Sequence, residues 1–329
     1  MAEFSPILID GLQYCRWDRE TMGHLRAGGV AAVHVTVVYW ENARETLTRL
    51  GEWNRRFETF PDRIVRVESS AEIVEASRTG RTGIFFGFQN CSPIEDEIGL
   101  VEVYRRLGVL FMQLTYNNQS LLAAGCYEQS DAGITRFGRK VIEEMNRVGM
   151  VVDMSHSAER STLEAIDLSS RPIVVSHANP SSWHPSIRNK SDPLLKALAA
   201  RGGLLGLSLY PFHLDGGGEC TLEAFCGMAA RTVDLMGIDH VALGSDLCTN
   251  QPLQVLEWMR SGRWTKDLDY GEGSTTQASW PEQPSWFRTA ADLPTVLDGL
   301  RTIGLSAADV NKIAGENWLR ILDESATPR

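Results

Sequence analysis

Short, nearly continuous runs of apolar, β-favouring residues recur eight times along the chain, and amphipathic stretches separate them. Strands that are buried on both faces have such runs, as in a parallel sheet covered by helices. The predicted strands span residues 7–12, 30–38, 82–89, 110–116, 149–155, 172–177, 203–209 and 240–245. The pattern therefore predicts an α/β protein with a parallel sheet.

Helical periodicity fills the intervals between these strands. The predicted helices span 41–58, 71–79, 98–107, 136–148, 158–168, 192–201 and 220–236, and two more lie near 290–303 and 306–323. Eight strands that alternate with helices predict a (β/α)8 TIM barrel. We expect residues 1–329 to form this single barrel domain. A doubly wound open sheet is the alternative, although it usually has fewer strands.

Residues 249–288, called the insert below, interrupt this rhythm directly after the eighth strand. The insert is rich in Gly, Ser, Thr, Gln and Pro, and it carries the tryptophans Trp258, Trp264, Trp280 and Trp286. Loops that follow barrel strands face the active site. We therefore expect a lid or pocket wall, with a packed excursion or an oligomer interface as the alternative.

Composition and charge narrow the possible partners and locations. The net charge of −10, without any Lys/Arg-rich run, argues against nucleic acid and anionic membranes. No apolar run approaches the ~18 residues of a membrane span, and the N-terminus lacks a signal-peptide pattern. Six scattered cysteines without a C-x-x-C pair indicate free thiols. Together these features predict a cytoplasmic protein.

Two histidines stand at equivalent positions on neighbouring strands. His156 and His177 each follow a serine at the end of an apolar run. In a barrel such ends meet at one face, so both imidazoles can converge on one metal ion. Asp246 ends the last strand in the same layer. It is the candidate general base, and a helix N-cap is the alternative role.

Two further polar residues lie in loops at this face. Arg188 follows the sixth predicted strand, where its guanidinium could clamp a substrate carboxylate through two hydrogen bonds. His213 follows the seventh strand and is a weaker candidate for substrate binding, since a histidine among aromatic residues is often structural. His34 lies inside the second strand and is expected to be a hydrogen-bonded core residue.

At this point the sequence resembles a known family, the membrane (renal) dipeptidases, which are the M19 peptidases of the amidohydrolase-like barrels. The likeness is clearest over 83–192 and continues to the C-terminus. Its motifs occur in family order and spacing: Gly-Phe-Gln-Asn, Gln-Leu-Thr-Tyr-Asn, Val-Asp-Met-Ser-His, Val-Val-Ser-His, Arg-Asn-Lys-Ser-Asp, Leu-Gly-Ser-Asp and Gly-Glu-Asn-Trp-Leu-Arg.

The resemblance implies a hydrolase that cleaves dipeptides with two zinc ions bridged by a glutamate. It implies that His156 and His177 match the two histidine ligands of the second metal. Arg188 matches the arginine that binds the substrate carboxylate, and Asp246 matches the acidic residue that ends the eighth strand.

Several positions depart from the family pattern in a coordinated way. The first strand of the family ends in His-x-Asp, and here these positions are Leu12 and Tyr14. Neither is a usual zinc ligand, and Asp10, two residues deeper, is a poor substitute. The bridging glutamate is replaced by the neutral Gln89, and the family's substrate-binding histidine by Tyr116. We therefore expect no metal at the first site and at most one zinc ion.

Three hypotheses follow. The first is a mononuclear zinc hydrolase acting on a dipeptide or small amide: His156 and His177 hold the metal, with Gln89 or Asp246 as a weak third ligand. Asp246 is the base, and Arg188 and Tyr116 bind the substrate, with Tyr14 and His213 as further candidates.

The second hypothesis is a metal-free or non-hydrolytic enzyme, such as a lyase or isomerase. Histidines and Asp246 would then do acid–base work, and Tyr14 and Tyr116 would donate protons. The third is a catalytically silent binding protein. By analogy with the family we also expect a homodimer, and we expect the insert to set a preference for an aromatic, apolar or cationic group.

Overall fold

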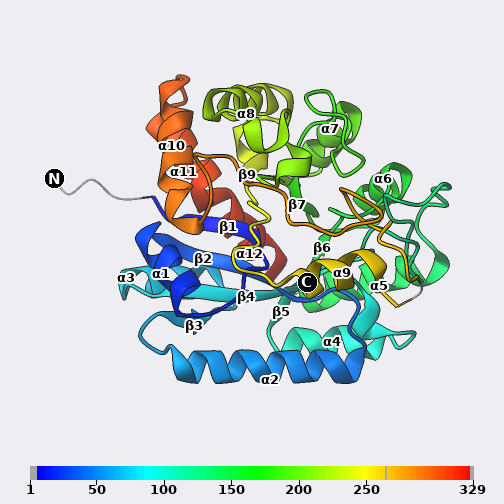
Figure 1. Cartoon of the computed structure of the whole chain (residues 1–329). Coiled ribbons are helices and arrows are strands. Elements are labelled where there is room, and N and C mark those ends of the chain that lie inside the picture. The colour runs from blue at the N-terminus through cyan, green and yellow to red at the C-terminus, as the bar shows by residue number, and fades with distance from the viewer. Residues whose placement is uncertain (1–5, 264, 327–329) are drawn as a thin grey trace.

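Eight parallel strands form the predicted barrel in the computed structural model, which describes residues 6–263 and 265–326 (Figure 1). Their order around the barrel is β1 (Leu8–Gln13), β2 (Val30–Val38), β4 (Thr82–Phe88), β5 (Val109–Gln113), β6 (Val151–Asp153), β7 (Val174–Ala178), β8 (Leu204–Leu207) and β9 (Val241–Leu243). The sheet closes between β1 and the end of β9, where Gln13 pairs with Leu247. The (β/α)8 prediction is confirmed.

Every predicted helix has a counterpart in the ring around the barrel. These are α2 (Ala43–Thr59), α3 (Ser70–Arg78), α4 (Gly99–Arg106), α5 (Arg136–Val148), α6 (Glu159–Leu168), α7 (Asp192–Ala200), α8 (Leu222–Met236), α10 (Leu293–Thr302), α11 (Ala307–Asn311) and α12 (Asn317–Ala326). A π-helical turn, Lys312–Glu316, separates α11 from α12, which the sequence pattern treats as one helix. Side-chain caps fix several of the starts, for example Asn42 at α2.

Two elements were not predicted, and a third falls within the insert. The helix α1 (Arg19–Ala27) begins at the N-cap Asp18 but buries only three residues, so its periodicity is weak. The strand β3 (Ile64–Arg66) pairs in parallel with β4 outside the barrel order, and three residues are too few for a recognisable pattern. The helix α9 (Leu253–Ser261) lies in the insert.

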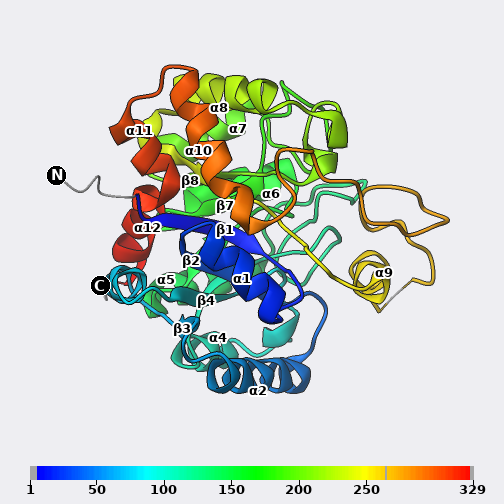
Figure 2. The ribbon, with the colours of Figure 1, turned by 60° about the vertical axis from the view of Figure 1, so that its left-hand side comes forward.

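The insert stands apart from the ring of helices, as Figure 2 shows for α9 and the loop that follows it. Trp40 Nε1 donates to the Met259 carbonyl of α9, at 3.2 Å. Arg263 Nε donates to the Trp40 carbonyl, at 3.0 Å. The insert is therefore attached to the end of β2. Of its four tryptophans, Trp264 lies outside the described residues. None of the described helices is long and apolar enough to cross a bilayer.

Trp318 of α12 fills the lower part of the barrel. It belongs to one buried cluster to which every barrel strand contributes at least one apolar residue: Ile9, Ala31, Ala32, Phe85, Leu110, Phe111, Val151, Val174, Leu204 and Ala242. Its Nε1 donates to the Leu243 carbonyl, at 2.9 Å. Such layers of side chains fill the inside of a TIM barrel, so it is a packed core and not a pore.

His34 lies against this layer. Its ring stacks on Phe85, with centroids 5.4 Å apart, and its Nδ1 is 2.7 Å from the Gly11 carbonyl. His34 is thus the hydrogen-bonded core residue that the sequence predicts, and the functional groups lie beyond it toward the carboxyl ends of the strands.

The contact of Gly11 with Trp318 gives a stability prediction. A Cβ at Gly11 would lie 2.1 Å from the Trp318 ring and 2.9 Å from the Leu243 carbonyl. Overpacking of this kind costs about 1–3 kcal/mol, so Gly11→Ala should lower the melting temperature. Gly23 in α1 has open space around its Cβ position, and Gly23→Ala should leave the melting temperature unchanged or raise it. Equal melting curves for both variants would contradict this packing.

Candidate active site

The structure brings His156, His177 and Gln89 together at the carboxyl ends of β6, β7 and β4. The two Nε2 atoms are 3.0 Å apart, and Gln89 Oε1 is 2.9 Å from His156 Nε2. All three side chains are buried. Gln89 Nε2 donates to Thr36 Oγ1 at 2.8 Å, which turns its carbonyl oxygen toward the histidines.

The outer partners of the two rings fix their protonation. His156 Nδ1 is 2.6 Å from Asn117 Oδ1, and because Asn117 Nδ2 donates to the Tyr270 carbonyl, Oδ1 is the acceptor. His177 Nδ1 is 2.8 Å from Ser176 Oγ, which donates its own proton to Asp153. Both Nδ1 atoms therefore carry hydrogen, and both Nε2 lone pairs point toward each other.

Two facing lone pairs at this distance repel unless a cation or a shared proton lies between them. Burial, reinforced by the Arg188 charge, lowers the pKa of both His156 and His177, which disfavours the proton. A small metal ion with nitrogen preference fits this pair, and the Gln89 oxygen offers a third donor. All three donors are neutral.

The residues do not fit a second metal ion. Leu12 is fully buried and has no donor atom in its side chain. Asp10 accepts hydrogen bonds from Gln13 Nε2 at 2.7 Å and from the Ser245 amide at 2.7 Å, so its carboxylate is engaged inside the barrel wall. Within residues 6–263 and 265–326, no three or more His, Cys, Asp or Glu side chains are grouped as metal ligands.

Arg188 lies beside the histidines and is 1% exposed. Its Nη1 donates to the Ser155 carbonyl, and its Nε lies 3.7 Å from Glu272 Oε1. Its Nη2 is buried and has no hydrogen-bond acceptor among the described residues. A buried guanidinium with an unused donor is costly unless an acceptor such as a substrate oxygen completes it.

Asp246 follows β9 and lines the same cavity as Arg188. Its backbone has φ of +59°, a left-handed conformation that aspartate tolerates better than most residues. Burial raises the pKa of Asp246 to about 8, although the charge of Arg188 opposes the shift. The carboxyl group is thus poised to exchange a proton near neutral pH.

The barrel face and the insert enclose one cavity around these groups. The barrel contributes Tyr14, Gln89, Tyr116, Asn117, His156, Arg188, Tyr210, His213 and Asp246, and the insert contributes Leu256, Met259, Arg260, Tyr270, Gly271 and Glu272. The free volume is about 30 Å³, room for roughly one or two water molecules.

Aromatic rings form much of this wall. Tyr116 stacks on His156 with centroids 4.3 Å apart, and its edge meets Trp40 at 5.0 Å. Tyr14 lies edge-on to Tyr39 at 6.1 Å. Tyr14 and Tyr116 thus belong to one aromatic cluster. They occupy the positions where the family has a metal-binding aspartate and a substrate-binding histidine.

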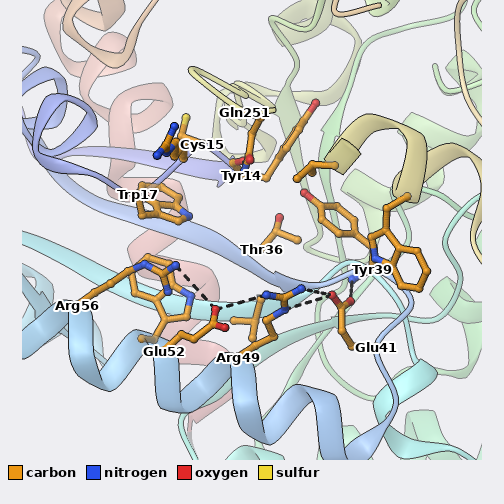
Figure 3. Close-up of a pocket in the computed structure, with 15 residues that line it drawn as sticks. Tyr14, Cys15, Trp17, Thr36, Tyr39, Glu41, Arg49, Glu52, Arg56 and Gln251 are labelled. Carbon is orange, nitrogen blue, oxygen red and sulfur yellow. Dashed lines mark hydrogen bonds and ion pairs between the residues drawn. The ribbon is translucent and has the colours of Figure 1, made fainter. Parts of the chain in front are cut away.

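A second cavity, of about 210 Å³, shares Tyr14 with the first (Figure 3). Figure 3 shows Arg49 and Glu52 on α2 along its lower side, with Glu41, which precedes α2, next to Arg49. Arg49 lies 3.4 Å from Glu41 and 3.4 Å from Glu52, so these charges are already paired. The first cavity, with its facing histidines and unpaired guanidinium nitrogen, is the better candidate for chemistry.

Sequence reasoning assigned no role to Asn117 or Glu272, which both contribute to this site. Asn117 directly follows Tyr116 and could have been suspected from its place after a strand. Its side chain joins His156 to the Tyr270 carbonyl of the insert. Glu272 reaches His213 Nε2 at 3.3 Å from the insert. No motif marks it in the sequence.

The closed ring of eight parallel strands has the fold of the amidohydrolase-like barrels. Residues 18–261 match the family described as membrane dipeptidase, peptidase family M19. The chain belongs to this family, as its motifs predict. The family is generally zinc-dependent.

Similar proteins agree with this assignment. The crystal structure of an amidohydrolase from Pseudomonas aeruginosa superposes with a TM-score of 0.92 and 34% identity, over 97% of this chain and 96% of that one. Dipeptidase verJ of Clonostachys rogersoniana is 29% identical over 86% of this chain and 66% of its own length. Dipeptidase tcpJ of Claviceps purpurea is 24% identical over 87% of this chain. The chain spans only 61% of tcpJ, the first of these curated relatives.

The burial of Asp246 predicts a pH-dependent stability difference. The folded pKa of about 8 lies above the ordinary value of 3.8, so wild-type protein loses stability as pH rises between these values. Asp246→Asn removes this loss and suits the left-handed backbone. In metal-free protein, the free energy of unfolding of Asp246→Asn should match that of wild type near pH 4 and exceed it near pH 9 by at least about 2 kcal/mol. Denaturant titrations measure this. The exposed Asp234→Asn is the control, and a difference that does not change with pH would refute the assignment.

The Asn117 contacts predict a local change in the insert. Asn117→Asp keeps an acceptor for His156 and tolerates the φ of +65°, but it loses the donor to Tyr270. Amide hydrogen exchange should therefore accelerate in residues 268–274 while zinc binding persists. The neighbouring Asn118→Asp serves as the control, because Asn118 donates only to the adjacent Gln119 carbonyl. Unchanged exchange in 268–274 would show that Asn117 does not hold the insert.

Proposed function

We propose that this protein hydrolyses an amide bond in a dipeptide or a similar small substrate and uses at most one zinc ion. The observation that carries the proposal is one cavity that contains two facing imidazole lone pairs, an unsatisfied guanidinium donor and a buried carboxyl group. The dipeptidase names of relatives support the same reaction class. Nothing observed favours a lyase, an isomerase or a silent binding protein.

His156, His177 and Gln89 are the residues that would hold the zinc ion, which supplies Lewis-acid activation of water in such sites. Asn117 and Ser176 hold both rings in the required tautomer. Because all three donors are neutral, we expect weaker zinc binding than in a site with a carboxylate ligand.

The remaining groups bind the substrate and move a proton. Arg188 Nη2 is suited to donate a hydrogen bond to the anionic end of the substrate. Burial raises the pKa of Tyr14 and Tyr116, so both phenols keep their protons and can donate to a developing oxyanion. Asp246, once ionised, takes the proton from the attacking water and returns it to the leaving nitrogen.

The same proposal includes the organisation of the protein. We propose that residues 1–329 form one barrel domain, because the insert lines a cavity of the barrel and does not form a separate domain. The homodimer is proposed by analogy with the family alone. The six cysteines are free thiols in the structure, which supports a reducing compartment such as the cytoplasm.

Metal content and turnover of matched variants test the proposed function. Elemental analysis should give close to one zinc per chain, and a panel of dipeptides and small amides should include a substrate. His177→Ala should lose both zinc and turnover. Asp246→Asn should keep zinc and lose turnover by about 100-fold or more, the usual contribution of a general base.

Three results would contradict this proposal. Two zinc ions per chain would refute the mononuclear site. Full activity after chelation would refute the role of the metal. Unchanged turnover in Asp246→Asn would refute the proton transfer assigned to that residue.

A further inference from the structure

The insert places a carboxylate directly beside the guanidinium that is the candidate anchor of the substrate. Glu272 Oε1 lies 3.7 Å from Arg188 Nε and 3.3 Å from His213 Nε2. The Glu272 side chain is 17% exposed, and the side chains of Arg188 and His213 are 1% exposed. A negative and a positive charge therefore lie next to each other in one cavity that water scarcely enters.

A neutral His213 ring satisfies both of its hydrogen bonds in this group. Ser208 Oγ is 2.7 Å from His213 Nδ1, so a neutral ring can accept from Ser208 and donate from Nε2 to Glu272. Burial lowers the pKa of His213, which favours the neutral ring. Burial alone would raise the pKa of Glu272, but His213 and Arg188 outweigh it and lower that pKa. Glu272 and Arg188 thus form a charge pair beside a neutral histidine.

This balance restricts what Arg188 can bind. A substrate that brings only a carboxylate would leave one buried negative charge beside Glu272 without a partner, which is costly. A substrate that brings an ammonium and a carboxylate on the same carbon keeps the balance. Its carboxylate accepts a hydrogen bond from Arg188 Nη2, which otherwise lacks an acceptor, and its ammonium binds Glu272.

We propose that Glu272 and Arg188 together recognise the free α-amino-acid head group of the substrate. This inference rests on the proposed hydrolase function and specifies its substrate class. Because both the α-amino and the α-carboxyl group are then free, the amide that is cleaved lies in the side chain of that residue. The class therefore comprises side-chain amides and dipeptides joined through a side-chain carboxyl group. Hydrolysis adds water across that C–N bond and releases the amine and the side-chain acid.

The position of Glu272 in the insert links recognition to closure. Asn117 Nδ2 donates to the Tyr270 carbonyl at 2.7 Å, two residues before Glu272. The Tyr270 amide in turn donates a hydrogen bond to the Arg260 carbonyl, at 3.1 Å. An ammonium group in the cavity therefore gains its partner only when this part of the insert is in place.

Binding measurements test the head group without requiring turnover. Calorimetry compares free glutamate with N-acetylglutamate, whose α-nitrogen carries no charge. Wild type should bind glutamate at least about 10-fold more tightly, as expected for a charged hydrogen bond. Glu272→Gln should abolish this preference. Glu257→Gln, on the exposed side of α9 in the same insert, should preserve it.

Kinetics then compare a γ-linked glutamyl dipeptide with the α-linked dipeptide of the same two residues. The γ-linked form should have the higher kcat/KM, and Glu272→Gln should raise its KM about 10-fold or more with little change in kcat. Tighter binding of N-acetylglutamate by Glu272→Gln would overturn the inference, because Glu272 would then merely occupy the anion site. Preference for the α-linked dipeptide would also overturn it. Head-group binding without any hydrolysis would instead refute the proposed function alone.

Discussion

The buried carboxylate of Asp153 holds the two histidine-bearing strands in place. It accepts hydrogen bonds from the Ser155 amide at 3.0 Å and the Ser155 hydroxyl at 2.6 Å. It also accepts from the Ser176 amide at 3.1 Å, from the Ser176 hydroxyl, and from Gln113 Nε2 at 2.9 Å. A carboxylate this deep is tolerated only when donors surround it. Each serine directly precedes a site histidine. The hydrogen bonds that stabilise the Asp153 carboxylate therefore also fix the backbone positions from which both imidazole rings extend.

The same device recurs at the closing seam of the barrel. Asp10 on β1 accepts from the amide and the hydroxyl of Ser245, which directly precedes Asp246. The amide of Asp246 in turn donates to the Leu12 carbonyl at 3.0 Å. Asp10 is therefore a structural group that positions Asp246, and this role explains why it does not replace a missing metal ligand. Two aspartates and three serines thus position the three principal groups of the site.

The sequence predicts the barrel well because each strand is buried on both faces and leaves a short apolar run. It also predicts which residues end those strands, so His156, His177 and Asp246 can be placed at one face before any distance is known. Glu272 escapes prediction for a physical reason. It reaches Arg188 across a loop whose path depends on distant contacts such as that of Asn117 with Tyr270. Neither spacing nor periodicity encodes such a path.

The changes at the first-metal positions have a consequence beyond the loss of ligands. Removal of a histidine and two carboxylates takes away charges that a second cation would have balanced. In their place Leu12, Tyr14 and Gln89 are neutral, so no carboxylate remains at these positions to balance a second metal ion. The charge that remains is carried by Arg188, Asp246 and Glu272. Of these three side chains, Glu272 reaches the site only through the insert. In this chain the insert contributes as much to the definition of the site as the barrel strands do.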